Sequence, residues 1–242
     1  ASWVRPFSEP PTLIREPCLP LGVNTRGRFR LAALLVVLSA MGGILAWPDL
    51  PAEMATHWDA AGTPDDTMPK PVALSLLPTL AAMLLGLFSV LPRTDPMGEN
   101  VESFRATYDW LAVLLVGTLS VVHIGLVAYN LGYRFPFVSL VLVAVAGLLY
   151  YAGVILERTR PNWIVGIRTP WTLSSGRVWE RTHALGAPLF KLTALSTLLG
   201  AVFPQYALLL LLGPLLTTTV VTVAYSYWLY QRLADEGSEK AA

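Results

Sequence analysis

The chain has 242 residues, of which 54% are hydrophobic and only 14% are charged, and its formal net charge is +1. Soluble globular domains are typically about 45–50% apolar and about 25% charged, so this composition excludes an ordinary soluble domain and indicates a membrane protein. The single cysteine, Cys18, excludes an intramolecular disulfide and a cysteine zinc site. The net charge gives no reason to expect direct binding of nucleic acid.

The N-terminal residues 1–28 precede the first long apolar stretch. They are rich in proline and poor in periodic apolar residues, so we predict a tail that is disordered or foreign to the natural protein. The arginines that end the tail resemble the start of a signal peptide. The apolar stretch that follows is too long for one, however, and "ILAWP" lacks the small residue needed at −3 of a cleavage site. A retained helix is therefore expected.

Charge-free segments long enough to cross a bilayer follow in chain order. A helix needs about 20 apolar residues for one crossing. Four such segments are Leu31–Trp47, Pro71–Leu91, Trp110–Tyr133 and Phe135–Leu156. A longer one, Leu192–Gln231, is interrupted by "FPQ" and predicts a helical hairpin. The fold class is thus an all-α, polytopic transmembrane bundle of about six spans, in which a short fifth span either crosses or re-enters the membrane.

Lys and Arg are distributed unequally between the predicted loops. If the N-terminus lies in the cytoplasm, only Lys70 and Arg134 of the seventeen Lys and Arg residues face outward. The positive-inside rule therefore predicts a cytoplasmic N-terminus.

These spans divide the chain into an N-terminal and a C-terminal membrane domain. The first domain, residues 29–133, contains spans one to three and an acidic outer loop at 48–70. The second, residues 134–231, contains spans four to six and an inner loop at 157–187. A polar tail, residues 232–242, ends the chain.

The outer loop carries five acidic residues against one lysine. Gly62 is suited to a positive φ and Asp65 and Asp66 to local hydrogen bonds, so a turn is predicted there. The simplest interpretation is an acidic loop anchored at the membrane interface by Trp47 and Trp58.

Two other interpretations of the outer loop remain open. Its negative charge would attract a cationic ligand or peptide. His57 with the nearby acids would suit a divalent ion, although a lone histidine is a weak pattern for a metal site.

The inner loop contains "NWIVGIRTPWTLSSGRVWERTH", residues 162–183. Gly166 and Pro170 exclude a continuous helix through its first half. Ser174 or Ser175 is suited to cap a helix that Pro188 bounds or kinks, which predicts a short amphipathic helix in the cytoplasmic interface between spans four and five.

Three roles for this loop remain open. Its Trp and Arg residues are typical of interfacial anchors. Arg168 or Arg177 is suited to bind a lipid phosphate through two hydrogen bonds. An exposed surface of Arg and Trp would also suit a cytoplasmic protein partner.

His123 is the strongly polar residue well inside a predicted span, which makes it a candidate functional group. The simpler expectation is a neutral imidazole bonded to a hydroxyl of a neighbouring helix. The hydroxyls proposed for it are those of Thr118, Ser120, Thr218, Thr222 and Ser226. The last three also form an i,i+4 ridge expected to join two helices. Asp109 is expected to be a charge that stabilises a helix N-terminus.

Recognisable catalytic patterns are absent from the sequence. It contains no Gly-rich phosphate loop, no G-x-S-x-G, no H-E-x-x-H and no pair of carboxylates within a span. We therefore predict that the protein is not an enzyme and has no cofactor and no metal.

Three loops carry a resemblance to a known family. "HWDAAGTPDD" resembles the His-Trp-Asn/Asp-x-x-Gly-x-x-Asp signature of a bacterial membrane domain of unknown function, with Asp59 where Asn is common. "LPRTDPMGENVESFRATYD" and "NWIVGIRTPWTLSSGRVWERTHALGAPLF" are similar to the patterns that follow in the SdpI (Sdp immunity protein) family. The resemblance covers about residues 31–230.

The resemblance implies a bacterial inner-membrane protein that protects a cell against a secreted toxic peptide and captures a cytoplasmic repressor. The hypothetical ligand-binding residues of the outer loop are His57, Trp58, Asp59, Gly62, Asp65 and Asp66. The hypothetical partner- or lipid-binding residues of the inner loop are Asn162, Gly166, Arg168, Thr169, Trp171, Trp179, Arg181 and His183. The alternatives are a transporter or enzyme with a site near His123, or a structural subunit of a membrane complex.

Overall fold

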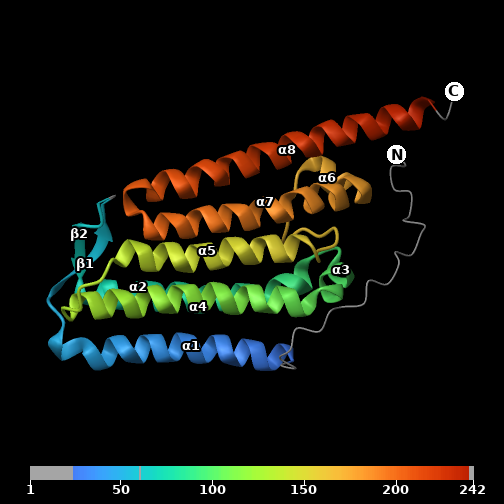
Figure 1. Ribbon diagram of the computed structural model, residues 1–242. Helices are drawn as coiled ribbons and strands as arrows, with labels where there is room; N and C mark the ends of the chain where they lie inside the picture. The colour runs from blue at the N-terminus through green and yellow to red at the C-terminus, as the bar shows by residue number, and fades with distance from the viewer. Residues whose placement is uncertain (1–23, 60, 240–242) are drawn as a thin grey trace.

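The computed structural model describes residues 24–59 and 61–239 (Figure 1). Within these residues, six helices are long and apolar enough to cross a membrane. They are α1 (Thr25–Ala46), α2 (Lys70–Thr94), α4 (Arg105–Asn130), α5 (Phe137–Leu156), α7 (Gly176–Val202) and α8 (Ala207–Glu239). The predicted polytopic helical fold is therefore confirmed. The predicted disorder of the first 23 residues concerns a segment outside the described ones, whereas the end of that predicted tail is the first turn of α1.

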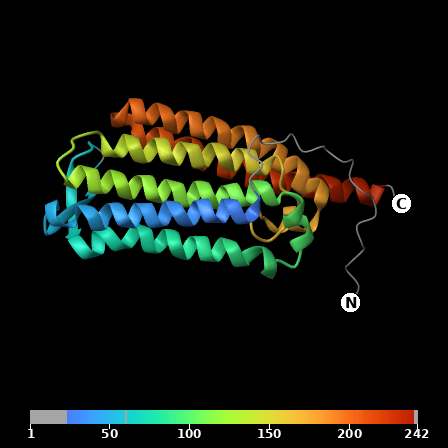
Figure 2. The same cartoon turned by 90° about the horizontal axis from the view of Figure 1, so that it is seen from below.

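The long helices lie side by side and run alternately up and down the molecule (Figures 1 and 2). In the N-terminal half, α1, α2 and α4 pack on one another. In the C-terminal half, α7 packs between α5 and α8. The principal contact between the halves is α4 against α5.

The two ends of the bundle are built differently. At one end lie the strands β1 (Glu53–Trp58) and β2 (Pro64–Pro69), with the 3-10 turns η1 (Trp47–Asp49) and η2 (Pro204–Tyr206). We call this the hairpin end. At the other end lie the short helices α3 (Gly98–Ser103) and α6 (Pro170–Ser174), together with the irregular loop 157–169. We call this the arginine-rich end.

The outward surfaces of the helices are apolar. Side chains such as Leu45 on α1 and Leu209 on α8 are 73% and 69% exposed. Continuous apolar surface of this kind is rare on soluble monomers but is what hydrocarbon requires. Several polar side chains, such as Ser39, His123 and Thr193, are buried between helices, where a neighbouring helix supplies a hydrogen-bond partner.

The outer loop forms an antiparallel β-hairpin, which was not predicted. The predicted turn is confirmed, because Gly62 connects the strands with a φ of 81°. The strand signal was the alternation of Met54 and Trp58 with exposed Glu53 and His57. This alternation is only six residues long, so it is easily missed beside the turn residues.

The fifth span is longer than predicted. The predicted interfacial helix is not separate, because it forms the first turns of α7, which continues through Pro188. Neighbouring helices in a membrane bundle allow such a proline to be accommodated. The predicted cap is confirmed, since the Ser175 side chain accepts a bond from the Val178 backbone N–H.

Candidate functional site

The hairpin is anchored to the bundle by Asn130, the last residue of α4. Its side-chain amide accepts a hydrogen bond from the Ala55 N–H at 2.8 Å and donates to the Ala55 carbonyl at 3.0 Å. The side-chain amide of Asn130 thus bonds the backbone N–H and carbonyl of Ala55 as a residue of a neighbouring strand would. Its NH2 group also donates to the Leu126 carbonyl, which fixes the amide on its own helix. The hairpin therefore has a defined position over the helix ends.

Trp58 belongs to the core under the hairpin. Its ring stacks on Phe137 of α5 with centroids 3.9 Å apart and meets Tyr129 edge-on at 5.1 Å. Only 9% of the residue is exposed. The predicted interfacial anchor is thus a packing residue that joins the hairpin to both halves of the bundle.

Asp59 shapes the hairpin turn. Its side-chain oxygen accepts bonds from the backbone N–H groups of Ala61 and Thr63, at 2.9 and 2.8 Å. An asparagine oxygen would accept the same two bonds, which accounts physically for the exchange of Asn and Asp in the signature. Asp59 and Gly62 therefore have a structural role in the turn of the hairpin rather than a direct role in binding.

Both strands of the hairpin carry exposed ionisable side chains, Glu53 and His57 on β1 and Asp65 and Asp66 on β2. His57 Nδ1 lies 2.6 Å from Asp65 Oδ1, and both side chains are largely exposed. Asp66 is exposed beside them and accepts a bond from the Thr67 N–H. Within the described residues, no three His, Cys, Asp or Glu side chains gather in a way that could hold a metal ion.

The basic residues of the hairpin end are occupied by structural contacts. Lys70 donates to the carbonyls of Trp47 and Leu50, and its ammonium lies over the Trp47 ring. Arg134 lies over the Tyr129 ring at 4.8 Å. The acidic residues outnumber these two cations, so this end of the molecule is negatively charged.

Replacing Asn130 with alanine is expected to loosen the hairpin while the helices stay folded. Ala55 would lose both side-chain partners, and a lost hydrogen bond of this kind costs about 1 kcal/mol when water can replace it. Amide hydrogen exchange of residues 53–58 should accelerate about fivefold. Exchange in α7 serves as the internal control; equal acceleration there would mean that the whole fold had been weakened instead.

At the arginine-rich end, Asn162 organises the loop 157–169. Its buried amide NH2 donates to the Thr159 hydroxyl and to the carbonyls of Arg160 and Val165. Its oxygen accepts from two backbone N–H groups, those of Ile164 and Val165. All of these partners are local, so Asn162 holds a loop that has no regular secondary structure.

Gly166, Trp179 and His183 form a second buried unit. The His183 ring stacks on Trp179 with centroids 4.1 Å apart. Its Nε2 accepts the Ile167 N–H at 3.0 Å, so Nδ1 carries the proton and donates to the Trp179 carbonyl at 2.8 Å. Gly166 has a φ of 122° and passes directly over this pair. The unit fastens the loop to the start of α7.

Thr169 and Trp171 connect the same loop to α8. Thr169 caps α6 in a reciprocal arrangement with Thr172, and its hydroxyl lies 3.1 Å from that of Ser226. Trp171 packs on Tyr227 with centroids 4.9 Å apart. Arg168 and Arg181 remain exposed, and Arg168 donates to the Trp163 carbonyl. Of the predicted inner-loop residues, these two arginines present the most accessible charge.

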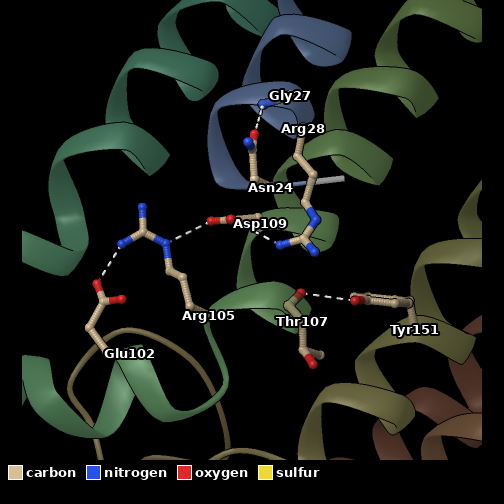
Figure 3. Close-up of polar contacts among 8 residues, drawn as sticks. All are labelled: Asn24, Gly27, Arg28, Glu102, Arg105, Thr107, Asp109 and Tyr151. Atoms are coloured by element: carbon tan, nitrogen blue, oxygen red, sulfur yellow. Dashed lines mark hydrogen bonds and ion pairs between the residues drawn. The ribbon is translucent and has the colours of Figure 1, made fainter. Parts of the chain in front are cut away.

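Asp109 lies in a buried ion-pair network that the sequence did not reveal (Figure 3). It accepts a hydrogen bond from Arg105 Nε at 2.8 Å and faces Arg28 of α1 at 3.4 Å. Arg105 also contacts Glu102 of α3 at 2.6 Å. The carboxylate is fully buried. The expected role as a helix N-terminal charge was therefore wrong, because Asp109 lies beyond the first turn of α4 and joins α4 to α1.

The same end contains polar ties between the two halves of the molecule. The Tyr151 hydroxyl donates to the Thr107 carbonyl at 2.9 Å (Figure 3). The Asn100 side chain donates to the Pro161 carbonyl at 2.7 Å, and Asp95 accepts the Trp163 N–H. The loop that precedes α4 is thus bound to the loop that follows α5.

His123 is buried between α1 and α4. Its Nδ1 lies 2.8 Å from the Ser39 hydroxyl, so the predicted hydroxyl partner is present. The partner is Ser39 of α1 and none of the hydroxyls that were proposed, because α1 packs on the face of α4 that carries His123. The predicted ridge on α8 does join helices, since Thr218 lies 3.0 Å from Thr193 of α7.

The six long helices, their apolar outer surfaces and their inward polar contacts define a multi-pass α-helical membrane protein with a structured site at each end. Residues 34–82 match the domain of unknown function DUF1648, and residues 158–226 match the SdpI/YfhL protein family. The chain is also 24% identical over 208 residues to the immunity protein SdpI of Bacillus subtilis (strain 168), covering 84% of this chain and 96% of that protein. No solved structure matches the chain.

The chain is thus similar to the SdpI family in its C-terminal half and to an SdpI immunity protein over most of its length. The first matched region contains the hairpin, and the second contains the inner loop with α6, α7 and most of α8.

Proposed function

We propose that this protein is an immunity protein of the SdpI type, which protects a bacterial cell by binding a secreted toxic peptide at the hairpin end. The observation that carries the proposal is an anchored hairpin whose exposed charges are mainly acidic. The similarity to a relative named as an immunity protein supports it.

The proposed orientation places the hairpin outside the cytoplasmic membrane and the arginine-rich end in the cytoplasm. Support comes from the positive-inside rule, since Lys70 and Arg134 are the basic residues of the connections at the hairpin end. A toxin arriving from outside would then meet the acidic hairpin first.

The physical basis of the binding is charge complementarity. Asp65 and Asp66 are exposed, and the basic side chains at this end are engaged with carbonyls and rings. A negative surface of this kind raises the local concentration of a cationic peptide and speeds its association.

Expression in a peptide-sensitive bacterium is expected to raise survival against at least one cationic peptide from a panel of secreted bacterial toxins. The variant Asp65→Asn/Asp66→Asn should lose about fivefold in protective potency, because two exposed ion pairs together contribute about 1 kcal/mol. The minimal inhibitory concentration measures the effect.

The matched control is Glu99→Gln/Glu180→Gln, which removes the same charge from exposed residues of the arginine-rich side. This variant should protect as well as the unmodified protein. Protection by the unmodified protein against none of the peptides would refute the proposed function.

A sensor role is proposed for the arginine-rich end, where a cytoplasmic repressor or an anionic lipid would bind. Arg168 and Arg181 are suited to such contacts because they are exposed. The buried Trp179 and His183 would then act indirectly, by holding the loop that carries Arg168. We propose no catalytic step.

A further inference from the structure

A cavity of about 410 Å³ lies directly beneath the hairpin. Its walls come from β1, β2, α2, α4 and α5, and they are mainly apolar. Side chains that matter for the argument are His57, Trp58, Leu76, Leu77, Phe137 and Val141. Because α2 and α5 both pack on α4, the cavity occupies the space above α4 between these two helices.

The cavity lies near the first turns of α2 and is lined there by a residue that is also exposed on the outer surface of the bundle. Leu76 on its rim is 49% exposed. It lies six residues after Lys70, the first residue of α2, which places it about 9 Å from the helix end. Amphipathic peptides that lie in the membrane interface bury their apolar face about 5–10 Å deep. With the start of α2 at the membrane surface, Leu76 would lie at the depth that such a peptide's apolar side chains reach.

Trp58 provides a polar group beside this apolar space. It lines the cavity, and its indole N–H is buried without a hydrogen-bond partner within the described part of the chain. A buried donor without an acceptor is costly, so an incoming acceptor would be favoured. A carbonyl of a bound peptide backbone would be such an acceptor.

The rim of the cavity carries charge of one sign. His57 lines the cavity and contacts Asp65, and its strand partner in the hairpin is Asp66. Apolar walls under an acidic rim are complementary to an apolar face bordered by lysines or arginines.

We propose that the cavity beneath the hairpin binds the apolar face of a cationic amphipathic peptide that lies in the membrane interface. Bulky apolar side chains enter between α2 and α5, the Trp58 N–H bonds a backbone carbonyl, and Asp65 and Asp66 pair with the peptide's cations. The inference rests on the proposed function and specifies its ligand class and binding site.

A larger apolar groove of about 880 Å³ lies between α1, α4 and α5. Among the described residues, no charged side chain lines it. It provides the comparison site for the experiment, since a peptide that merely dissolves in lipid would have no reason to prefer the smaller cavity.

The test uses the full chain in phosphatidylcholine nanodiscs. The probe is a synthetic Leu/Lys peptide of about 18 residues, long enough to form a helix, with a photoreactive leucine on its apolar face. Cross-linked residues are mapped by mass spectrometry, with and without excess unlabelled peptide. Leu76→Trp fills the mouth of the cavity, whereas Leu80→Trp, one turn further along α2, lines neither cavity and is the matched control.

The expected result is competed labelling of residues 73–77 and 137–141 in the unmodified protein and in Leu80→Trp, reduced about tenfold in Leu76→Trp. Labelling spread over the outer leucines of α7 and α8, or concentrated in the larger groove, would overturn the proposal. So would a photoreactive phospholipid that labels the cavity and is not displaced by the peptide.

Survival assays with the same variants separate this inference from the proposed function. If Leu76→Trp protects cells as well as Leu80→Trp does, the cavity is not the binding site while the immunity function stands. If the unmodified protein protects against no peptide but the cavity is labelled competitively, the immunity function fails and the binding site stands.

Discussion

Asp109→Ala is expected to destabilise the protein by about 3–5 kcal/mol, the usual effect of removing one partner from a buried ion pair. The change leaves Arg105 and Arg28 without their common carboxylate, and the side chain of Arg28 is only 12% exposed. Because Arg28 belongs to α1 and Arg105 to α4, the contact between these helices should weaken at the arginine-rich end. The free energy of unfolding, measured by denaturant titration in detergent micelles, reports the effect.

Glu102→Gln is the control for this prediction. Glu102 contacts Arg105 but is 61% exposed, and exposed ion pairs contribute only about 0–1 kcal/mol. Adding Arg28→Met to Asp109→Ala should cost less than Arg28→Met alone, since the shared interaction is already lost. Additive effects of the two changes would contradict the ion-pair interpretation.

Gly166→Ala is expected to cost about 3 kcal/mol, from backbone strain and from the loss of a buried hydrogen bond. An alanine Cβ would lie 2.5 Å from His183 Nε2 and 3.1 Å from the Trp179 ring, at a φ of 122°. Accommodating it requires the loop to move away from α7, which breaks the bond from the Ile167 N–H. The free energy of unfolding and the exchange rate of the Ile167 amide should both change.

Gly62→Ala separates strain from steric overlap. Gly62 has a φ of 81°, but no atom of the described residues would lie within 4 Å of an alanine Cβ at this position, so only backbone strain of about 1 kcal/mol applies. If Gly62→Ala proved as costly as Gly166→Ala, the packing of Gly166 against His183 would not be the reason for its glycine.

The features that sequence predicts well are local. Charge-free length predicted the spans, and a single glycine or serine predicted the turn at Gly62 and the cap at Ser175. Trp179 and His183 are four residues apart, a spacing that places two side chains on one face of a helix, and their rings stack.

The features that were missed depend on contacts between distant segments. Arg28 and Asp109 are 81 residues apart in the chain, and Ser39 and His123 are 84 apart. Hydrogen bonding between helices is not encoded by the spacing of residues within either one. Arg105, four residues before Asp109, was a local indication of the ion pair, but it could not show that Arg28 of α1 also takes part.

The burial of Trp58 was missed for a related reason. Tryptophan beside a predicted span is typical of the membrane interface. Its partner Phe137 belongs to the other half of the chain, so only the folded arrangement shows that the ring is enclosed.

The principal contact between the halves, α4 against α5, has a mechanical consequence. Each half keeps its own three-helix packing if one rotates against the other about this contact as a hinge. At the arginine-rich end, the hydrogen bonds from Tyr151 to Thr107 and from Asn100 to Pro161 hold the two halves together. At the hairpin end, the stacking of Trp58 on Phe137 does so. A ligand in the cavity beneath the hairpin would lie against Trp58 and Phe137, so its binding would act first on the contact that holds the halves together at that end.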